Sequence, residues 1–343
     1  MGRRHIKNME EFAEVSRISR PTVSKYFHDP ESVRATTRER IEAALKKYDY
    51  RPNIFAINQN RKLTKTIGVV VPYLADPFFG EIARNIERRC IDAGFWPSLY
   101  SSHGSPEFEV EVLDSLRSQK PAGVLLAPLG RISNKAAIEK FCNDVPTVLF
   151  DSNLEGLGAA FVGSDNYSFV SQSVEYLTRT GTEPVFFEMR HPPNPNANKR
   201  RKAYLEMMDK LKLEPQIVQV EGDGWAFEEI GYDGAMRLLT SGEMKSNTIL
   251  CSNDRLAIGF LAAAFEQGVR VGRGSECDMR VASHDDHPFS RFTGPSLTTV
   301  AHDYLAVANR SVETLFKLIQ EDSESLPRTE VVFPARLVLR ASA

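Results

Sequence analysis

F-A-E-V-S-R-I-S-R-P-T-V, residues 12–23, is the segment that reveals how the beginning of this chain is organised. Its apolar residues Phe12, Ala13, Val15 and Ile18 recur at the spacing of one buried helical stripe. The polar residues in the middle of the segment interrupt the stripe, and residues that favour a helix start follow them. The segment therefore predicts two short helices joined by a turn of three or four residues.

Capping residues mark where both helices begin. Asn8 can cap the first helix, and Glu11, at the third helical position, can reach back to it as in a capping box. Ser19 can cap the second helix. Pro21 then lies in the first turn of that helix, where its missing N–H costs nothing. Two helices connected in this way form a helix-turn-helix unit, whose second helix lies in the major groove of DNA.

A third helix is expected to begin near Thr36 or Thr37 and to close a small core. Apolar residues on one of its faces would pack against the apolar residues of the first two helices. The expected core consists of Phe12, Val15, Val23 and Phe27 together with Ile41, Ala44, Leu45 and Tyr48. We therefore predict a three-helix DNA-binding domain over residues 1–50.

Three segments of this region resemble the lac repressor (LacI/GalR) family of transcriptional regulators. They are A-E-V-S-R-I-S-R-P-T-V-S-K at 13–25, T-R-E-R-I-E-A-A-L at 37–45 and Y-R-P-N at 50–53. The similarity then continues through nearly the whole chain. The family usually has Gly where Arg17 stands, which implies a left-handed backbone or a slightly different turn. It usually caps the third helix with Ser at the position of Arg34, so the cap is expected at Thr36 or Thr37 instead.

The resemblance implies which residues of the second helix meet DNA. Arg20 and Pro21 occupy the places where the family reads base edges. An arginine can bond guanine through two hydrogen bonds, and a proline can contact a thymine methyl group. A phosphate contact by Arg20 is the alternative, and Thr22, Ser24 and Asn8 are expected to position phosphates. The predicted DNA-binding residues of this domain are Asn8, Ser19, Arg20, Pro21, Thr22, Ser24 and Lys25.

A hinge helix that enters the DNA minor groove as a dimer pair is implied directly after this domain. Asn53 and Ala56 match the hinge pattern of the family, and both are predicted DNA contacts. Gln59 stands where the family inserts a leucine into the central base step and kinks the DNA. We predict that Gln59 bonds base edges instead. Either Phe55 or Ile57 then helps to fill the dimer contact, or the DNA is bent less.

From Thr66 onward, apolar strands alternate with helices. I-G-V-V-V-P, residues 67–72, is short, apolar and β-branched, as a fully buried parallel strand would be. The further strands are expected at 96–100, 123–127, 146–150, 184–188, 216–220, 248–251, 280–283 and 330–333. The helices are expected at 78–93, 106–119, 133–142, 166–180, 198–211, 227–241, 254–267 and 303–320. This alternation predicts doubly wound parallel sheets.

The resemblance implies that this α/β region forms two lobes, like a periplasmic sugar-binding protein, with an effector in the cleft between them. We expect a hinge and linker at 51–65 and an effector and dimerisation domain at 66–343. Its first lobe would comprise about 66–165 and 302–328, and its second about 166–301 and 329–340. The expected fold class is α/β, with a three-helix helix-turn-helix domain before a two-lobed, doubly wound, periplasmic-binding-protein-like domain.

Ligands of open α/β sheets bind outside the carboxyl ends of the strands, so the candidates are polar and aromatic residues that follow strands. Carboxylates pair with neighbouring hydroxyls, Arg donates in a rigid fork, and an aromatic face packs on the C–H side of a sugar ring. By resemblance, Arg200, Asn253 and Asp285 match effector-binding residues of the family, and His302 stands where a polar contact is common. The predicted effector-binding residues are Tyr73, Asp76, Phe78, Phe79, Asp151, Arg200, Trp225, Asn253, Asp285 and His302.

Several of these assignments have a structural alternative. Arg201 replaces Arg200 if the register is off by one residue. Phe78 is equally suited to the core, and Trp225 can simply cover the mouth of the cleft. Asp254 is expected to cap a helix rather than to bind a ligand.

Other kinds of chemistry find little support in the sequence. The run His284 to His287 holds two His and two Asp, but it follows a strand and matches a loop of the family, so no metal is predicted. We find no Ser-His-Asp set, G-x-S-x-G or P-loop, and we therefore predict no enzyme and no cofactor. A sugar-binding transport component is a further alternative, but it would need a signal sequence.

Charge is divided unevenly along the chain. Residues 1–65 contain 15 Lys and Arg and 8 Asp and Glu, a net charge of +7, so the remaining residues carry −9 of the total of −2. A basic head on an acidic body suits DNA binding by the head alone. The absence of an 18-residue apolar run or a secretory signal, and four scattered cysteines, predict a cytoplasmic protein that acts on the bacterial nucleoid and has no membrane partner.

These observations predict a sequence-specific repressor of carbohydrate uptake or catabolism genes that responds to a sugar, a sugar alcohol or a sugar phosphate. A purine or another corepressor is the alternative effector. The resemblance implies a homodimer on a near-palindromic operator, and the chain ends at Ala343 without the tetramerising tail of the lac repressor. The effector would close the lobes and either unfold or stabilise the hinge helix, and the sequence leaves that direction open.

Overall fold

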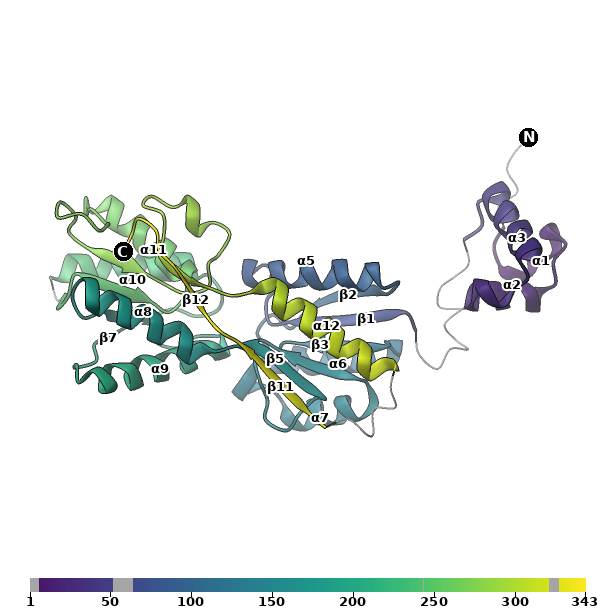
Figure 1. Ribbon diagram of the computed structural model, residues 1–343, viewed down its shortest axis with the longest axis horizontal. Helices are drawn as coiled ribbons and strands as arrows, with labels where there is room; N and C mark the ends of the chain where they lie inside the picture. The colour runs from purple at the N-terminus through teal and green to yellow at the C-terminus, as the bar shows by residue number, and fades with distance from the viewer. Residues whose placement is uncertain (1–5, 52–63, 243, 321–326) are drawn as a thin grey trace. The chain divides into compact units, whose positions relative to one another are not determined.

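The computed structural model describes residues 6–51, 64–242, 244–320 and 327–343. The chain divides into two compact units, residues 1–64 and 65–343 (Figure 1). The predicted hinge residues Asn53, Ala56 and Gln59 lie outside the described residues. Within the described ranges, no helix is both long enough and apolar enough to cross a membrane.

The first unit contains the three predicted helices. They are α1 (Met9–Ser16), α2 (Arg20–His28) and α3 (Ala35–Tyr48), with a short 3-10 turn, Pro30–Ser32, before α3. Phe12, Val23 and Ile41 are fully buried at the centre, as the apolar stripes predict. Tyr50 closes this core by stacking on Phe12, with ring centroids 4.7 Å apart.

The start of α3 differs from the expectation. The helix begins at Ala35 rather than at Thr36 or Thr37, and its N-cap is Arg34, whose side chain makes no capping hydrogen bond. Val33, directly before the cap, is buried. Packing of this apolar residue determines where the chain enters the helix and overrides the preference for a polar cap.

The first lobe of the second unit is built on a six-stranded parallel sheet. Its spatial order is β11 (Thr329–Phe333), β5 (Ala160–Ser164), β4 (Thr147–Phe150), β3 (Gly123–Leu126), β1 (Thr66–Val71) and β2 (Trp96–Ser101). One face is covered by α5 (Pro77–Asp92) and α12 (Tyr304–Gln320), and the other by α6 (Pro106–Gln119) and α7 (Lys135–Asp144). Because both faces are covered, the four inner strands β1, β3, β4 and β5 are buried along nearly their whole length, whereas the edge strands β2 and β11 are partly exposed.

The second lobe repeats this architecture around four parallel strands. They lie in the order β7 (Ile217–Val220), β6 (Val185–Met189), β8 (Thr248–Cys251) and β9 (Arg280–Ala282). The covering helices are α8 (Asn166–Thr180) and α9 (Pro195–Leu211) on one face, with α10 (Phe227–Ser241) and α11 (Asp254–Glu266) on the other. A small antiparallel pair, β10 (Thr299–Ala301) and β12 (Arg336–Val338), completes the lobe.

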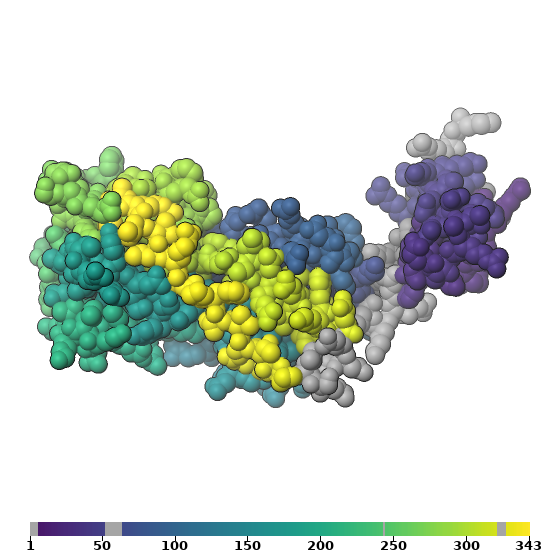
Figure 2. All heavy atoms as spheres, in the orientation of Figure 1, coloured from purple at the N-terminus to yellow at the C-terminus, as the bar shows by residue number. Residues whose placement is uncertain are grey.

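The expected division of the C-terminal residues between the lobes is wrong in one respect. The sequence predicts residues 329–340 in the second lobe, but β11 pairs with β5, with Thr329 beside Ala160, and so belongs to the sheet of the first lobe. Beyond β11 the chain crosses to the second lobe. Figure 2 shows this C-terminal segment in yellow, running over both lobes. Sequence periodicity identifies a strand, but it does not show which sheet has a free edge for it.

Candidate functional sites

The turn between α1 and α2 has the geometry of a helix-turn-helix motif. Arg17 adopts φ 52° and ψ 42°, the left-handed conformation expected where the family has Gly. Ser19 accepts a hydrogen bond from the backbone N–H of Thr22 at 3.4 Å and caps α2. Asn8 caps α1 by accepting from the N–H of Glu11 at 2.9 Å, whereas the Glu11 carboxylate accepts from the N–H of Lys7. The capping box is therefore displaced by one residue.

One face of α2 is free within its unit to meet a partner. Val23 points into the core and is fully buried, whereas Arg20, Pro21, Ser24 and Lys25 are exposed. The Arg20 side chain is 65% exposed and lies 3.5 Å from the Glu10 carboxylate, an ion pair that water and salt weaken. The Arg20 guanidinium can therefore exchange this partner for a base edge or a phosphate.

The cleft between the lobes gathers most of the predicted effector residues. Seven of them line one small cavity: Asp76, Phe78, Phe79, Asp151, Arg200, Asn253 and Asp285. The other three do not line this cavity: His302 and Trp225 contact the lining residues Phe78 and Phe79, and Tyr73 stacks on Trp225. The expectation that ligand groups follow the strands therefore selects residues that the fold brings together.

Arg200 and Asp285 form a buried ion pair at the centre of the cleft. Their side chains are 3% and 14% exposed, and the guanidinium nitrogen lies 2.5 Å from the carboxylate oxygen. Arg200 also donates to the carbonyl of Ser252 at 2.7 Å, while the Asp285 carboxylate lies 3.1 Å from Nε2 of His302. Burial alone would raise the pKa of Asp285, but Arg200 and His302 outweigh it and hold that pKa well below its usual range.

The backbone at both central acids is unusual. Asp151 has φ 60°, in the left-handed region that Asp and Asn enter more readily than most residues, whereas Asp285 has φ 119°, a value that residues with a Cβ rarely adopt. A conformation like that of Asp285 costs on the order of 1–3 kcal/mol and persists at functional sites, where the surrounding structure enforces it. The strain at Asp285 therefore supports a role for its carboxylate beyond packing.

Asp151 is buried with few partners. Within the described part of the chain, its carboxylate accepts a hydrogen bond from Nδ2 of Asn196, at 2.8 Å. Burial raises the pKa of Asp151 to about 7, and the nearby Lys199 and Arg200 lower it only in part. A carboxyl group with this much spare hydrogen-bonding capacity is suited to bind the hydroxyls of a ligand.

Direct contacts hold the two lobes together. Asp76 caps α5 by accepting from the N–H of Phe78 at 2.9 Å, and its other oxygen accepts from Arg255 of the second lobe at 3.1 Å. Tyr73 stacks on Trp225 across the same cleft, with ring centroids 5.2 Å apart. The cavity between the two lobes has a volume of about 20 Å³, which is room for roughly one water molecule. A ligand of sugar size requires these contacts to rearrange.

Five further residues line the cavity although the sequence analysis did not select them. They are Asn194, Asn196, Phe227, Arg255 and His287. All lie in loops that follow strands or in the first turns of the helices that begin there, so position relative to a strand end was the available signal. The expectation for Asp254 is wrong: Asn253 caps α11, by accepting from the N–H of Leu256. The Asp254 carboxylate is buried and accepts from Ser290, Thr299 and the N–H of His287.

The side chains of the run His284 to His287 face different partners. Nδ1 of His284 lies 3.0 Å from the carbonyl of Cys251, and Asp286 accepts from Arg340 at 2.6 Å. Burial lowers the pKa of His284 to about 3, so this ring is neutral. Among the residues that the structure describes, no group of three or more His, Cys, Asp or Glu could hold a metal ion.

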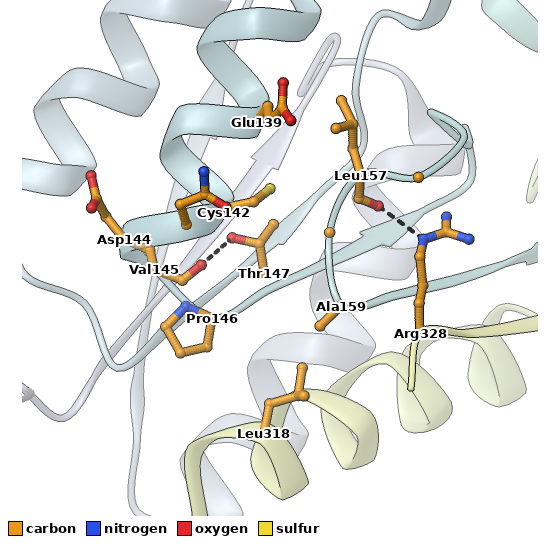
Figure 3. A pocket seen from close by; sticks show the side chains of 13 residues that line it. Glu139, Cys142, Asp144, Val145, Pro146, Thr147, Leu157, Ala159, Leu318 and Arg328 are labelled. Atoms are coloured by element: carbon orange, nitrogen blue, oxygen red, sulfur yellow. Dashed lines mark hydrogen bonds between the residues drawn. The ribbon is translucent and has the colours of Figure 1, made fainter. Parts of the chain in front are cut away.

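A larger cavity, of about 430 Å³, lies at the opposite end of the first lobe (Figure 3). Its lining includes the residues that directly precede β4, β5 and β11, which are Pro146, Ala159 and Arg328, so it lies at the amino ends of the strands. Arg328 donates there to the carbonyl of Leu157. Ligands of open parallel sheets bind at the carboxyl ends, and this cavity has none of the buried charge pairs of the cleft.

Both units of the chain resemble known proteins. Residues 8–53 match the bacterial regulatory proteins of the lacI family, and residues 174–343 match a periplasmic binding protein-like domain. The HTH-type transcriptional repressor PurR of Haemophilus influenzae strain PittEE is 27% identical over 340 residues, 97% of this chain and 98% of its own length.

Two solved structures share the fold. The lac repressor bound to ONPG in the repressed state superposes with a TM-score of 0.83 at 24% identity, covering 99% of this chain and 100% of its own. A LacI family transcriptional regulator from Enterococcus faecium with bound ribose superposes with a TM-score of 0.69 at 21% identity, covering 81% of this chain and 98% of its own. The helix-turn-helix unit and the two-lobed α/β unit therefore occur together in known regulators.

Proposed function

Because the chain belongs to the lacI family of bacterial regulatory proteins, in which a DNA-binding domain is joined to an effector-binding domain, we propose that it represses genes of carbohydrate uptake or catabolism. A sugar-type effector between the two lobes would set its affinity for the operator. The observation that carries this proposal is the convergence of Asp76, Asp151, Asp285 and Arg200 on one cleft at the carboxyl ends of the strands. The Enterococcus faecium regulator of the same fold holds ribose.

The cleft residues suit a ring with several hydroxyls. Carboxylates accept from pairs of neighbouring hydroxyls, and the Arg200 fork donates to a hydroxyl or ring oxygen. Phe78, Phe79 and Phe227 offer aromatic faces to the C–H side of the ring. Binding would replace contacts between the lobes, such as Asp76 with Arg255, and would change how the lobes are held. The predicted hinge and linker, residues 51–65, would then be released from, or stabilised on, the operator.

A homodimer is part of the proposal. β2 is an edge strand of the first sheet, and it presents Trp96 and Leu99, 60% and 41% exposed. Ile91 of the adjacent helix α5 is 45% exposed. Large apolar side chains on a strand edge favour pairing with a second chain. Light scattering should give twice the mass of one chain, and Trp96→Glu should shift the protein toward the monomer, whereas a monomeric native protein contradicts the proposal.

The function is tested by a thermal-shift screen of the purified protein against pentoses, hexoses, sugar alcohols, sugar phosphates and purines. The screen is repeated with genomic operator fragments. A carbohydrate that raises the melting temperature and weakens operator binding supports an inducible repressor, and one that strengthens operator binding supports a corepressor. If only purines stabilise the protein, the carbohydrate proposal is wrong and the purine-dependent alternative replaces it.

Arg20 is expected to read a base rather than only to hold the backbone. Arg20→Ala should then weaken operator binding by about 5- to 150-fold and relax the preference at one base position. Binding measured on operators with each base substituted provides the test. Lys25→Ala, a change on the same exposed face, is expected to weaken binding to all sequences alike. The same uniform loss with Arg20→Ala would instead make Arg20 a phosphate contact.

A further inference from the structure

Both arginines that line the cleft already have carboxylate partners. Arg200 lies 2.5 Å from Asp285, and Arg255 donates to Asp76 at 3.1 Å. Arg255 also donates two hydrogen bonds of 2.7 Å to the carboxylate of Glu228. The side chains of Arg200 and Arg255 are only 3% and 12% exposed, so water does little to screen these pairs. Neither guanidinium therefore offers an unpaired positive charge to a ligand.

A third acid in the cleft has no guanidinium of its own. The Asp151 carboxylate accepts from the neutral amide of Asn196. Lys199 donates to Oδ1 of that same Asn196 at 3.0 Å rather than to the carboxylate. Three acids and two arginines line the cavity. The other polar residues of the lining are uncharged: Asn194, Asn196, Asn253 and His287. Lys199 lies close enough to lower the pKa of Asp151, but it donates to Asn196, so the hydrogen bond that this third acid accepts comes from a neutral group.

The cleft also contains an uncharged hydrogen-bond donor, the side chain of His287. The His287 side chain lines the cavity, is 3% exposed, and its Nε2 atom is buried without a hydrogen-bond partner among the described residues. Burial lowers the pKa of His287, so the ring is uncharged near neutral pH. A buried polar atom without a partner costs free energy that a ligand hydroxyl can recover. The neutral His287 ring can therefore hydrogen-bond to a ligand hydroxyl, but it offers no positive charge to an anion.

We propose that the cleft selects an uncharged, polyhydroxylated ligand and discriminates against the phosphate ester of the same compound. This inference rests on the proposed function and narrows its ligand class. A phosphate monoester carries about −1.5 to −2 charges at neutral pH. Inside the cleft it would have to take Arg200 from Asp285 or Arg255 from Asp76, and each exchange leaves a buried carboxylate without its guanidinium partner beside a second anion. Hydroxyls meet no such conflict, because they donate to the carboxylates.

The test compares matched pairs of ligands on the full-length protein at pH 7.5. Calorimetry would measure D-ribose, D-glucose, D-fructose and D-mannitol against ribose 5-phosphate, glucose 6-phosphate, fructose 6-phosphate and mannitol 1-phosphate. We expect at least one neutral compound to bind, and its ester to bind about 100-fold more weakly or worse. An ester that binds as tightly as its neutral partner overturns the inference and leaves the carbohydrate function standing. Binding of no member of any pair counts against both.

A variant separates charge from shape in this discrimination. Asp151→Asn removes one negative charge from the cleft and keeps the size of the side chain. It should therefore reduce the preference for the neutral compound by about tenfold. Asp209→Asn removes a charge from an exposed position near the end of α9 and should leave the preference unchanged. If both variants keep the full preference, the charge of Asp151 is not its source and the electrostatic argument is wrong.

Discussion

Replacing Arg200 with alanine should lower the free energy of unfolding by about 3–5 kcal/mol and abolish effector binding. The change leaves the buried Asp285 carboxylate without its guanidinium partner, and breaking a buried ion pair from one side has this cost. It also removes the hydrogen bond to the carbonyl of Ser252, which begins the loop into α11. Urea unfolding measures the loss of stability, and thermal shift with the identified ligand measures binding.

A double variant distinguishes the lost ion pair from lost packing. Arg200→Met combined with Asp285→Asn removes both charges, and Asn tolerates the positive φ of Asp285 better than most residues. We expect the double variant to recover roughly half or more of the lost stability without recovering ligand binding. Lys202→Ala, at an exposed position of the same helix, should change stability by less than about 0.5 kcal/mol. A double variant less stable than Arg200→Ala would show that the ion pair is not the main contribution.

Asp151→Asn should stabilise the protein at pH 8 and have little effect at pH 4. The pKa of Asp151 rises from its usual value of 3.8 to about 7 on folding because the carboxyl group is buried. Between these pH values the folded chain binds more protons than the unfolded chain, so this group makes the protein less stable as the pH rises. The whole shift corresponds to at most about 4 kcal/mol, and relaxation of the site reduces this to roughly 1–2 kcal/mol.

The asparagine keeps the structural features of Asp151. Its Oδ1 atom can still accept from Nδ2 of Asn196, and it accepts φ 60° readily. Melting temperatures measured from pH 4 to pH 8 test the expectation, with Asp209→Asn as the exposed control. Equal stability of variant and native protein at every pH would mean that Asp151 is better solvated or better paired than its burial indicates.

Local features of the chain were predictable from the sequence. The helices at 106–119, 166–180 and 227–241 and the strand at 248–251 have the bounds that their periodicity and flanking residues predicted. The caps Asn8 and Ser19 also follow from nearby residues. These signals lie within a few residues of one another, because a helix or strand needs a periodic apolar face and a local partner for its terminal N–H groups.

The candidate site was predictable only in part. Residues after strands were expected at one edge of each sheet, and the structure brings seven of the ten predicted residues to one cavity. The partners of these residues were not predictable. Asp76 and Arg255 are 179 positions apart, and Asn196 meets Asp151 only where the lobes touch. Spacing in the sequence carries no information on such pairs.

By itself, the sequence determined the helix-turn-helix unit, the alternation of strands and helices, and the class of residue at the strand ends. Only the tertiary structure decided that β11 completes the first sheet, that Asn253 rather than Asp254 caps α11, and that both arginines of the cleft are already paired with acids. The physical reason is the range of the interactions. Helix periodicity and capping act over about four residues, whereas a free sheet edge or a buried charge acquires its partner only when distant segments pack together.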